Sequence, residues 1–308
     1  CYNPINILKD LKDLIKACRP RQWIKNILVF AAPFFSFSYQ AELWLTTFYG
    51  FISFCFVSSS IYLFNDSVDF KYDRLHPSKS KRPIASGAIS IKTARFAALI
   101  LLVIGLLISL SVNTTLLLVI ILYVFIQFLY CLRLKSEPIL DISCISSGFL
   151  LRAIAGVSAS KLEFSPWFLL SVGLLALFLA IEKRKAELLN SIELKIKTRK
   201  SLERYSLSLL ERIEPIVTTS AFMSYSLWAV NSTINGSSNS YMMVSIPFVL
   251  IGIFRYQLIT DPSERKRREA LYPNVNPEKP EEILLSDKGI LFSILGWLFT
   301  IALVGLAL

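Results

Sequence analysis

The chain has 308 residues, of which 54% are hydrophobic, with a mean hydropathy of +0.55 and a formal net charge of +11. A soluble globular protein of this composition would be unusual, and long apolar runs indicate membrane-spanning helices. The positive charge does not require a nucleic-acid partner, because the arrangement of the loops accounts for it. We therefore expect an all-α integral membrane protein that binds no nucleic acid.

The N-terminal segment, residues 1–22, has the pattern of a helix that lies on a membrane surface. Between residues 5 and 18, apolar side chains fall on one helical stripe and lysines fall elsewhere. This pattern predicts an amphipathic helix on the inner leaflet. No cleavage site follows the first apolar run, so we expect a retained anchor and no signal peptide. The chain opens with Cys1 and not Met, so we expect that upstream residues have been trimmed.

Nine apolar runs predict nine membrane spans in one membrane domain that covers residues 1–308. The first run is the weakest, since it is short and is interrupted by Pro33. The charged loops between spans, 65–92, 183–215 and 259–288, are too short to fold around cores of their own. The predicted spans are 26–40, 44–64, 93–111, 114–132, 139–158, 165–182, 216–232, 240–258 and 289–307.

The basic residues test this map of spans. With nine spans, all of the 33 lysines and arginines except Arg152 and Lys161 lie on the same side of the membrane. The positive-inside rule then places the N-terminus and all the long loops in the cytoplasm. We expect a multi-pass protein of the inner, cytoplasmic membrane.

Three carboxylates follow the second span at the point where it leaves the bilayer. If the helix continues, Asp66, Asp69 and Asp73 lie at i, i+3 and i+7 and share one face. Like charges on one face repel, whereas a hard divalent cation takes such oxygen ligands together with substrate phosphates. We expect these three residues to be catalytic and to hold Mg²⁺, with Asn65 and Arg74 beside them. The alternative is a solvated helix end of mixed charge.

Two basic segments suit the phosphates of a substrate. Lys79 and Arg82 follow the acidic segment closely. Lys183, Arg184 and Glu187 follow the sixth span, and the two cations there offer a second phosphate-binding edge. The alternative for the second segment is a positive-inside anchor.

The fifth span carries two charged residues, Asp141 and Arg152. Eleven residues at about 100° each bring both to nearly the same helix face, about 16 Å apart along the axis. Arg152 should face protein or a water-filled cavity, where it holds a phosphate or forms a structural ion pair. Asp141 could join Tyr130 and Lys135 at the cytoplasmic rim, and Lys25 in the first span could turn inward.

These motifs resemble the UbiA superfamily of intramembrane transferases, and within it the branch of decaprenyl-phosphate phosphoribosyltransferases. The superfamily's usual second aspartate pair is absent, and Lys183 and Arg184 stand in that place. The resemblance covers essentially the whole chain. The matching segments are Arg19–Asn26, Asn65–Asp73, Asp73–Ala85, Leu134–Lys135, Leu140–Asp141, Leu151–Gly156, Lys183–Leu188 and Arg199–Leu202.

The resemblance implies a ring of nine helices around a cavity that opens to the cytoplasm and to lipid. It also implies transfer of 5-phosphoribose from phosphoribosyl diphosphate (PRPP) to a polyprenyl phosphate, with Mg²⁺ as cofactor. The product would be a precursor of lipid-linked arabinose. The expected partners are PRPP, the polyprenyl phosphate and the bilayer, and a homo-oligomer is left open.

Two other functions stay open at this point. One is prenyl transfer from an isoprenyl diphosphate to an aromatic ring, which a second carboxylate pair facing the first would favour. The other is a membrane transporter, which an inverted repeat with broken helices at mid-membrane would favour. The sequence displays neither feature.

Overall fold

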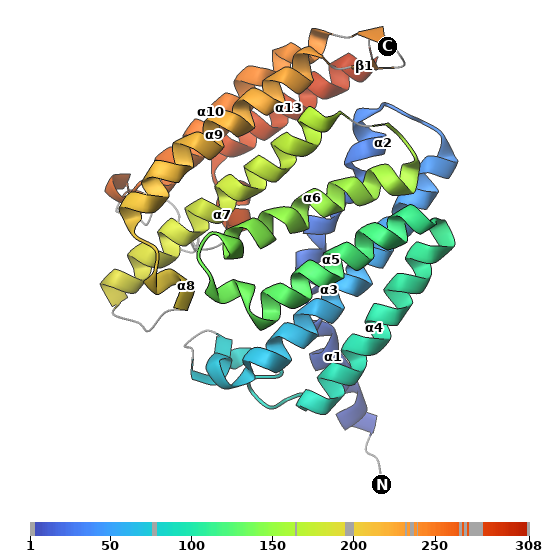
Figure 1. Cartoon of the computed structure of the whole chain (residues 1–308), viewed down its shortest axis with the longest axis vertical. Helices are drawn as coiled ribbons and strands as arrows, with labels where there is room; N and C mark the ends of the chain where they lie inside the picture. Colours follow the sequence, from blue (N-terminus) through green and yellow to red (C-terminus); the bar gives the residue numbers. More distant parts are fainter. Residues whose placement is uncertain are drawn as a thin grey trace. The chain divides into compact units, whose positions relative to one another are not determined.

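The computed structural model describes residues 4–75, 79–163, 165–194, 200–231, 233–234, 237–238, 240–264, 267, 270 and 280–306. His76 and Arg199, which belong to the family-like segments, lie outside the described residues. The described chain is helical apart from turns and one two-stranded antiparallel ribbon, β1 (Thr233–Ile234) and β2 (Ser237–Ser238). This agrees with the predicted all-α class. Figure 1 labels the elements.

The chain divides into two compact units, and each has its own core. That residues 1–308 form one membrane domain stays a prediction. Unit 1 comprises residues 1–135 and 151–163, and unit 2 comprises residues 136–150 and 164–308. The helix α6 (Leu140–Ser160) is continuous and contributes to both.

Unit 1 is built on the long helix α3, against which α4 packs along its length. Its core contains Phe54, Val57, Leu116, Ile120 and Tyr123. The helices α4 and α5 form the antiparallel hairpin seen in Figure 1. The elements of unit 1 besides α6 are α1 (Pro4–Ala17), η1 (Pro20–Phe30), α2 (Ala31–Phe35), α3 (Ala41–Leu75), η2 (Lys79–Lys81), α4 (Ile91–Val112) and α5 (Thr114–Leu132), followed by η3 (Leu134–Ser136) at the boundary.

Local capping explains where the helices of this hairpin begin. The hydroxyl of Ser90 accepts the backbone N–H of Thr93 at the start of α4. Asn113, in an extended conformation, ends α4, and its side chain accepts the N–H of Leu116 to begin α5. A single polar residue therefore makes the turn between two apolar helices.

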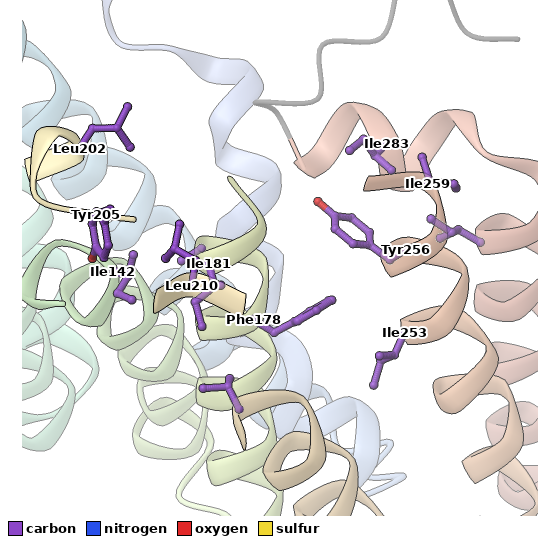
Figure 2. Close-up of a cluster of buried hydrophobic side chains, with 13 residues drawn as sticks. Ile142, Phe178, Ile181, Leu202, Tyr205, Leu210, Ile253, Tyr256, Ile259 and Ile283 are labelled. Atoms are coloured by element: carbon purple, nitrogen blue, oxygen red, sulfur yellow. The ribbon is translucent and has the colours of Figure 1, made fainter. Parts of the chain in front are cut away.

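Unit 2 packs its helices around a second apolar cluster, which Figure 2 shows. The cluster includes Ile142, Phe178, Leu210, Tyr256 and Ile283. In Figure 1, α9, α10 and α13 lie side by side, in agreement with their contacts. The elements of unit 2 besides α6 and the ribbon are α7 (Pro166–Leu194), α8 (Lys200–Glu203), α9 (Leu207–Val230), η4 (Ser240–Ser245), α10 (Ile246–Thr260), η5 (Pro262–Glu264), α12 (Pro280–Ser286) and α13 (Lys288–Leu306).

In the described part of the chain, seven helices are long and apolar enough to cross a membrane, and they coincide with seven of the nine predicted spans. The first predicted span, 26–40, does not form one long helix: residues 26–30 belong to η1 and residues 31–35 form the five-residue α2, which contains Pro33. Residues 216–230 of the seventh, 216–232, lie within α9, which has the expected length but contains many hydroxyl side chains. Among the described residues, seven of the nine predicted spans therefore have a matching membrane-length helix.

The helix α3 is long enough to extend beyond the apolar layer of a membrane. Its 35 residues correspond to about 52 Å at 1.5 Å per residue, whereas the hydrocarbon core is about 30 Å thick. The segment after Phe64 continues the helix to Leu75, as the predicted spacing of the aspartates requires. The N-terminal segment contains the helix α1, on which Leu11 and Ile15 are exposed, and its predicted place on the membrane surface stays a prediction.

Candidate active site

Three carboxylates on the last turns of α3 form the centre of the candidate site in unit 1. Asp66 and Asp73 are 3% and 5% exposed, and Asp69 is half-buried. A carboxylate at this level of burial requires charged or hydrogen-bonding partners. Each of the three has a basic partner in unit 1.

One guanidinium bridges the two most buried carboxylates. Nη1 of Arg82, in the turn after η2, donates to Oδ1 of Asp66 at 3.1 Å and to Oδ2 of Asp73 at 2.6 Å. Two carboxylate oxygens therefore converge on a single cationic nitrogen. This arrangement confirms that the spacing of the aspartates along the helix brings their side chains to one place.

A second guanidinium, which the sequence did not single out as a site residue, also holds Asp66. Nη2 of Arg19 lies 2.5 and 2.7 Å from the two oxygens of Asp66. The backbone of Arg19 is left-handed, with φ 54°, where α1 gives way to η1. Its guanidinium also lies 4.9 Å from the ring centroid of Tyr62. The turn and the ring together direct Arg19 toward the cluster.

Asp69 has a separate partner, because its Oδ1 pairs with Nζ of Lys135 in η3. The cluster of unit 1 therefore contains three carboxylates, those of Asp66, Asp69 and Asp73, and three cations, those of Arg19, Arg82 and Lys135. We call these six residues the α3 cluster. Their formal charges balance.

The α3 cluster fits a magnesium ion through two of its carboxylates. No group of three or more His, Cys, Asp or Glu side chains lies close enough to hold a metal anywhere in the described residues. Mg²⁺ is commonly bound by one or two carboxylates together with substrate phosphates and water. Asp66 and Asp73 would supply the carboxylates, and both already contact one positive charge, that of Arg82.

A deeper polar group surrounds Arg152 on α6. Nε of Arg152 donates to Oδ1 of Asn26 at 2.7 Å, and Nη2 donates to the hydroxyl of Tyr123 at 3.1 Å. Its guanidinium also lies over the rings of Tyr123 and Phe54, at 5.0 and 5.6 Å from their centroids. These neutral hydrogen-bond acceptors and rings fix the orientation of a buried cation.

Close backbone packing supports this group. A Cβ atom added to Gly156, four residues after Arg152, would collide with the backbone of Val29. The absence of a side chain at Gly156 therefore lets α6 approach η1, which carries Asn26.

In unit 2, Arg184 is buried between two carboxylates. It is 1% exposed, its Nε lies 2.9 Å from Oδ2 of Asp141, and its Nη1 pairs with Glu187. The sequence predicts a role in phosphate binding for Arg184, and that role stays a prediction. In this structure the guanidinium of Arg184 pairs with the carboxylates of Asp141 and Glu187.

Tyr205 completes this group, and the sequence did not indicate it. Its hydroxyl donates to Oδ1 of Asp141 at 2.7 Å and accepts the N–H of Ile139 at 2.6 Å. Burial, and then the hydrogen bond to Asp141, raise the pKa of the Tyr205 phenol well above its usual value. Asp141, Arg184, Glu187 and Tyr205 form what we call the α7 charge group.

A second buried network in unit 2 was also missing from the predictions. Nζ of Lys185 lies 2.9 Å from Glu182 and 2.6 Å from Glu214, which in turn accepts a hydrogen bond from Gln257 at 2.8 Å. The i, i+3 spacing of Glu182 and Lys185 was visible in the sequence. The partners on α9 and α10 come from remote positions and gave no local signal.

The other predicted site residues have differing environments. Arg74 is exposed, and its Nε donates to the carbonyl of Ala85 at 2.8 Å. It contacts none of the carboxylates of the α3 cluster through an ion pair between described side chains. The half-buried residues among the remaining predictions are Lys25, Asn65, Lys79, Tyr130 and Lys183.

Comparison with known proteins agrees with this architecture. Residues 27–276 match the model of the UbiA prenyltransferase family. A decaprenyl-phosphate phosphoribosyltransferase of Mycolicibacterium smegmatis is 39% identical over 94% of this chain and 92% of its own length. The proteins of the same name from Corynebacterium glutamicum and Mycobacterium tuberculosis are 37% and 35% identical, over 96% and 97% of this chain and 87% and 95% of their own lengths.

Solved structures of low sequence identity share the fold. A UbiA homolog from Archaeoglobus fulgidus bound to GPP and Mg²⁺ superposes with a TM-score of 0.67 at 17% identity, covering 96% of this chain and 98% of that one. A structure of a digeranylgeranylglyceryl phosphate synthase gives a TM-score of 0.68 at 17% identity, over 97% and 99% of the two chains.

The fold defines a multi-pass helical membrane protein. The chain belongs to the UbiA prenyltransferase family. It is a transferase of that family, as the resemblance of its motifs implied.

Proposed function

We propose that this transferase moves 5-phosphoribose from PRPP to a polyprenyl phosphate of the decaprenyl type and releases diphosphate. The observation that carries the proposal is the α3 cluster, in which buried carboxylates and basic side chains meet at the end of a membrane helix. A metal–diphosphate donor needs both kinds of group. The names and the near full-length similarity of the relatives support the choice of donor and acceptor.

In the proposed reaction, the bond between C1 of the ribose and the diphosphate oxygen breaks, and a phosphate oxygen of the lipid forms the new bond to C1. Asp66 and Asp73 would hold Mg²⁺, which when bound neutralises charge on the departing diphosphate. Arg82 and Arg19 are close enough to the same carboxylates to contact a phosphate bound there. The acceptor is already an anion, so the site needs no strong general base.

Asp69 and Lys135 have a supporting part in this proposal. Their ion pair joins α3 to η3 beside the two buried carboxylates. Lys135 can therefore present its ammonium to a phosphate while Asp69 keeps it in place. Lys79 is half-buried on the short η2 helix just before Arg82 and would extend the same basic surface.

Two further sites would serve the other phosphate groups of the substrates. Arg152, oriented by Asn26 and Tyr123, would bind a second phosphate. Lys183 is half-buried and would bind a substrate phosphate, while the adjacent Arg184 pairs with Asp141 and Glu187. Charge-assisted contacts of this kind contribute about 1.5–3 kcal/mol each.

A transfer assay tests the donor directly. Membranes that contain the protein would receive a polyprenyl phosphate together with either PRPP labelled in the ribose or a labelled isoprenyl diphosphate. We expect label from PRPP, and not from the isoprenyl diphosphate, in the lipid fraction, and an Asp73→Asn variant should abolish it. Transfer of the isoprenyl label to an aromatic acceptor would instead identify a prenyltransferase.

We further infer that the α3 cluster faces the cytoplasm, in the inner membrane, with the N-terminus on the same side. The one-sided distribution of lysine and arginine supports this orientation. PRPP is a highly charged solute that does not cross a bilayer unaided, so a cytoplasmic site gives it direct access. Intact and inverted vesicles should differ accordingly, with turnover of externally added PRPP only in the inverted ones.

A further inference from the structure

Arg82 occupies a position that the proposed metal would need. Its Nη1 lies 3.1 Å from Asp66 and 2.6 Å from Asp73, so one nitrogen neutralises both carboxylates. Arg19 holds both oxygens of Asp66 from a different segment, at 2.5 and 2.7 Å. The carboxylate oxygens that suit Mg²⁺ are therefore engaged by the protein's own cations.

The partners in these ion pairs differ in how easily they can leave. The side chains of Asp66 and Asp73 are 4% and 7% exposed and stand on the rigid helix α3. The side chains of Arg19 and Arg82 are 26% and 28% exposed and project from turns. Arginine side chains are long and have many rotamers, so these cations can withdraw while the carboxylates remain in place.

Electrostatic repulsion would favour the withdrawal of the two arginine side chains. The α3 cluster is neutral, and a divalent cation added beside Arg19 and Arg82 would place four positive charges around Asp66 and Asp73. Repulsion between unit charges a few ångströms apart is strong in a partly buried site. A metal that arrives with a phosphate-bearing donor removes this conflict, because the displaced guanidiniums gain phosphate oxygens as new partners.

We propose that Arg82, assisted by Arg19, is a resident counter-cation that holds the metal-binding carboxylates of Asp66 and Asp73 and transfers to substrate phosphate when metal enters. This inference rests on the proposed metal role of the two carboxylates. It makes the metal and the diphosphate bind cooperatively and keeps metal affinity low while donor is absent.

The test measures metal binding without turnover. Mn²⁺, a paramagnetic substitute for Mg²⁺, is titrated into the purified full chain in phosphate-free buffer, and unbound Mn²⁺ is followed by electron paramagnetic resonance. We expect Arg82→Gln to tighten Mn²⁺ binding roughly tenfold, about 1.4 kcal/mol. The preformed complex of Mn²⁺ with methylene diphosphonate, an analogue of diphosphate that cannot be hydrolysed, should bind the same variant about tenfold more weakly. Opposite changes for the two ligands are not expected from a general loss of structure.

Two variants serve as controls. Arg95→Gln removes a positive charge from the same unit, where Arg95 contacts Ser67 and pairs with no carboxylate among the described residues, so Mn²⁺ affinity should change less than about twofold. Asp73→Asn should abolish Mn²⁺ binding. If Arg82→Gln does not fold, Arg19→Gln removes the other cation on Asp66 and is expected to act in the same direction.

The outcomes separate this inference from the proposed function. Equal Mn²⁺ affinity in wild type and Arg82→Gln, with binding lost in Asp73→Asn, would overturn the role of Arg82 and leave the metal site standing. Binding unaffected by Asp73→Asn, or absent from every variant, would overturn both. Tighter metal binding together with unchanged affinity for the metal–diphosphonate complex would also overturn the proposal, since the transfer to phosphate would be missing.

Discussion

At the scale of single residues, burial decides which charged side chains can be removed without unfolding the protein. Asp73 is buried but pairs with the partly exposed Arg82, whereas Asp141 is fully buried against Arg184 and Tyr205. Both are carboxylates near the end of a membrane helix, but the side chain of Arg82, which pairs with Asp73, is 28% exposed and that of Arg184, which pairs with Asp141, is 2% exposed. Substitutions in these two environments should therefore have different effects.

The first concerns the carboxylates of the α3 cluster. Asp66→Asn or Asp73→Asn keeps the shape of the side chain but removes its charge, so metal and phosphate binding should be lost and turnover should fall more than a hundredfold. Excess EDTA should have the same effect on wild type. The matched control is Glu137→Gln, which removes an exposed carboxylate paired with Arg204 and should stay within about twofold of wild type. Near-normal rates in both aspartate variants would refute the assignment.

The second concerns two neighbouring cations with different surroundings. Lys183→Ala should raise KM for PRPP by roughly tenfold to a hundredfold, since it removes one charge-assisted phosphate contact. Arg184→Ala should chiefly destabilise the protein, by about 3–5 kcal/mol, because Asp141 would be left as an unpaired buried charge. Enzyme assays and thermal unfolding of the two variants check this. A stable Arg184→Ala protein with a raised KM for PRPP would restore Arg184 as a direct phosphate ligand.

At the scale of elements, hydrogen bonds and close packing from remote segments hold the charged helices in register. Tyr205 follows α8 and fastens the start of α6 through Ile139 and Asp141. Gly156 allows the other half of α6 to contact η1. Neither residue carries charge, and both determine where the charged residues lie.

Tyr205 makes the stability of unit 2 decrease at alkaline pH. Its pKa is raised in the folded state by burial and by Asp141, so the folded protein favours the neutral phenol. The stabilisation is fully present below the unfolded pKa of about 10 and is lost as pH rises above that value toward the folded pKa. Unfolding temperatures measured from pH 8 to 11 should therefore fall more steeply for wild type than for Tyr205→Phe. Parallel curves would contradict this assignment.

The packing of α6 gives a test with a close control. Gly156→Ala places a methyl group against the backbone of Val29, so the variant should lose about 1–3 kcal/mol of stability and should also disturb Arg152. The control is Gly173→Ala in α7, where the added atom would meet only ordinary contacts of 3.9 Å or more. It should be neutral or slightly stabilising. Equal unfolding temperatures for the two variants would show that α6 can shift without cost.

At the scale of the whole molecule, sequence reasoning reached the membrane class and the acidic motif because both depend on local patterns. Hydropathy identified seven helices that the structure contains, and helical spacing brought Asp66 and Asp73 together. It did not find Arg19 or Tyr205 as partners, since their contacts join positions 47 and 64 residues apart. It also took residues 26–40, with Pro33 and the buried Asn26, as one span, where the structure has the end of η1 and the short helix α2.

The orientation of the chain in the membrane is the last testable consequence. If the one-sided lysines and arginines direct insertion, the N-terminus and both charged segments are cytoplasmic. An odd number of spans then places the C-terminal end of α13 on the opposite side. Alkaline phosphatase fused after Leu308 should be active, since it requires an oxidising compartment outside the cytoplasm, and green fluorescent protein fused there should be dark. The same reporters inserted after Ser90, before α4, should give the reverse result. Fluorescence from the C-terminal fusion would mean an even number of spans, and η1 with α2, which are too short to cross the bilayer as one regular helix, would be the first segment to reassign.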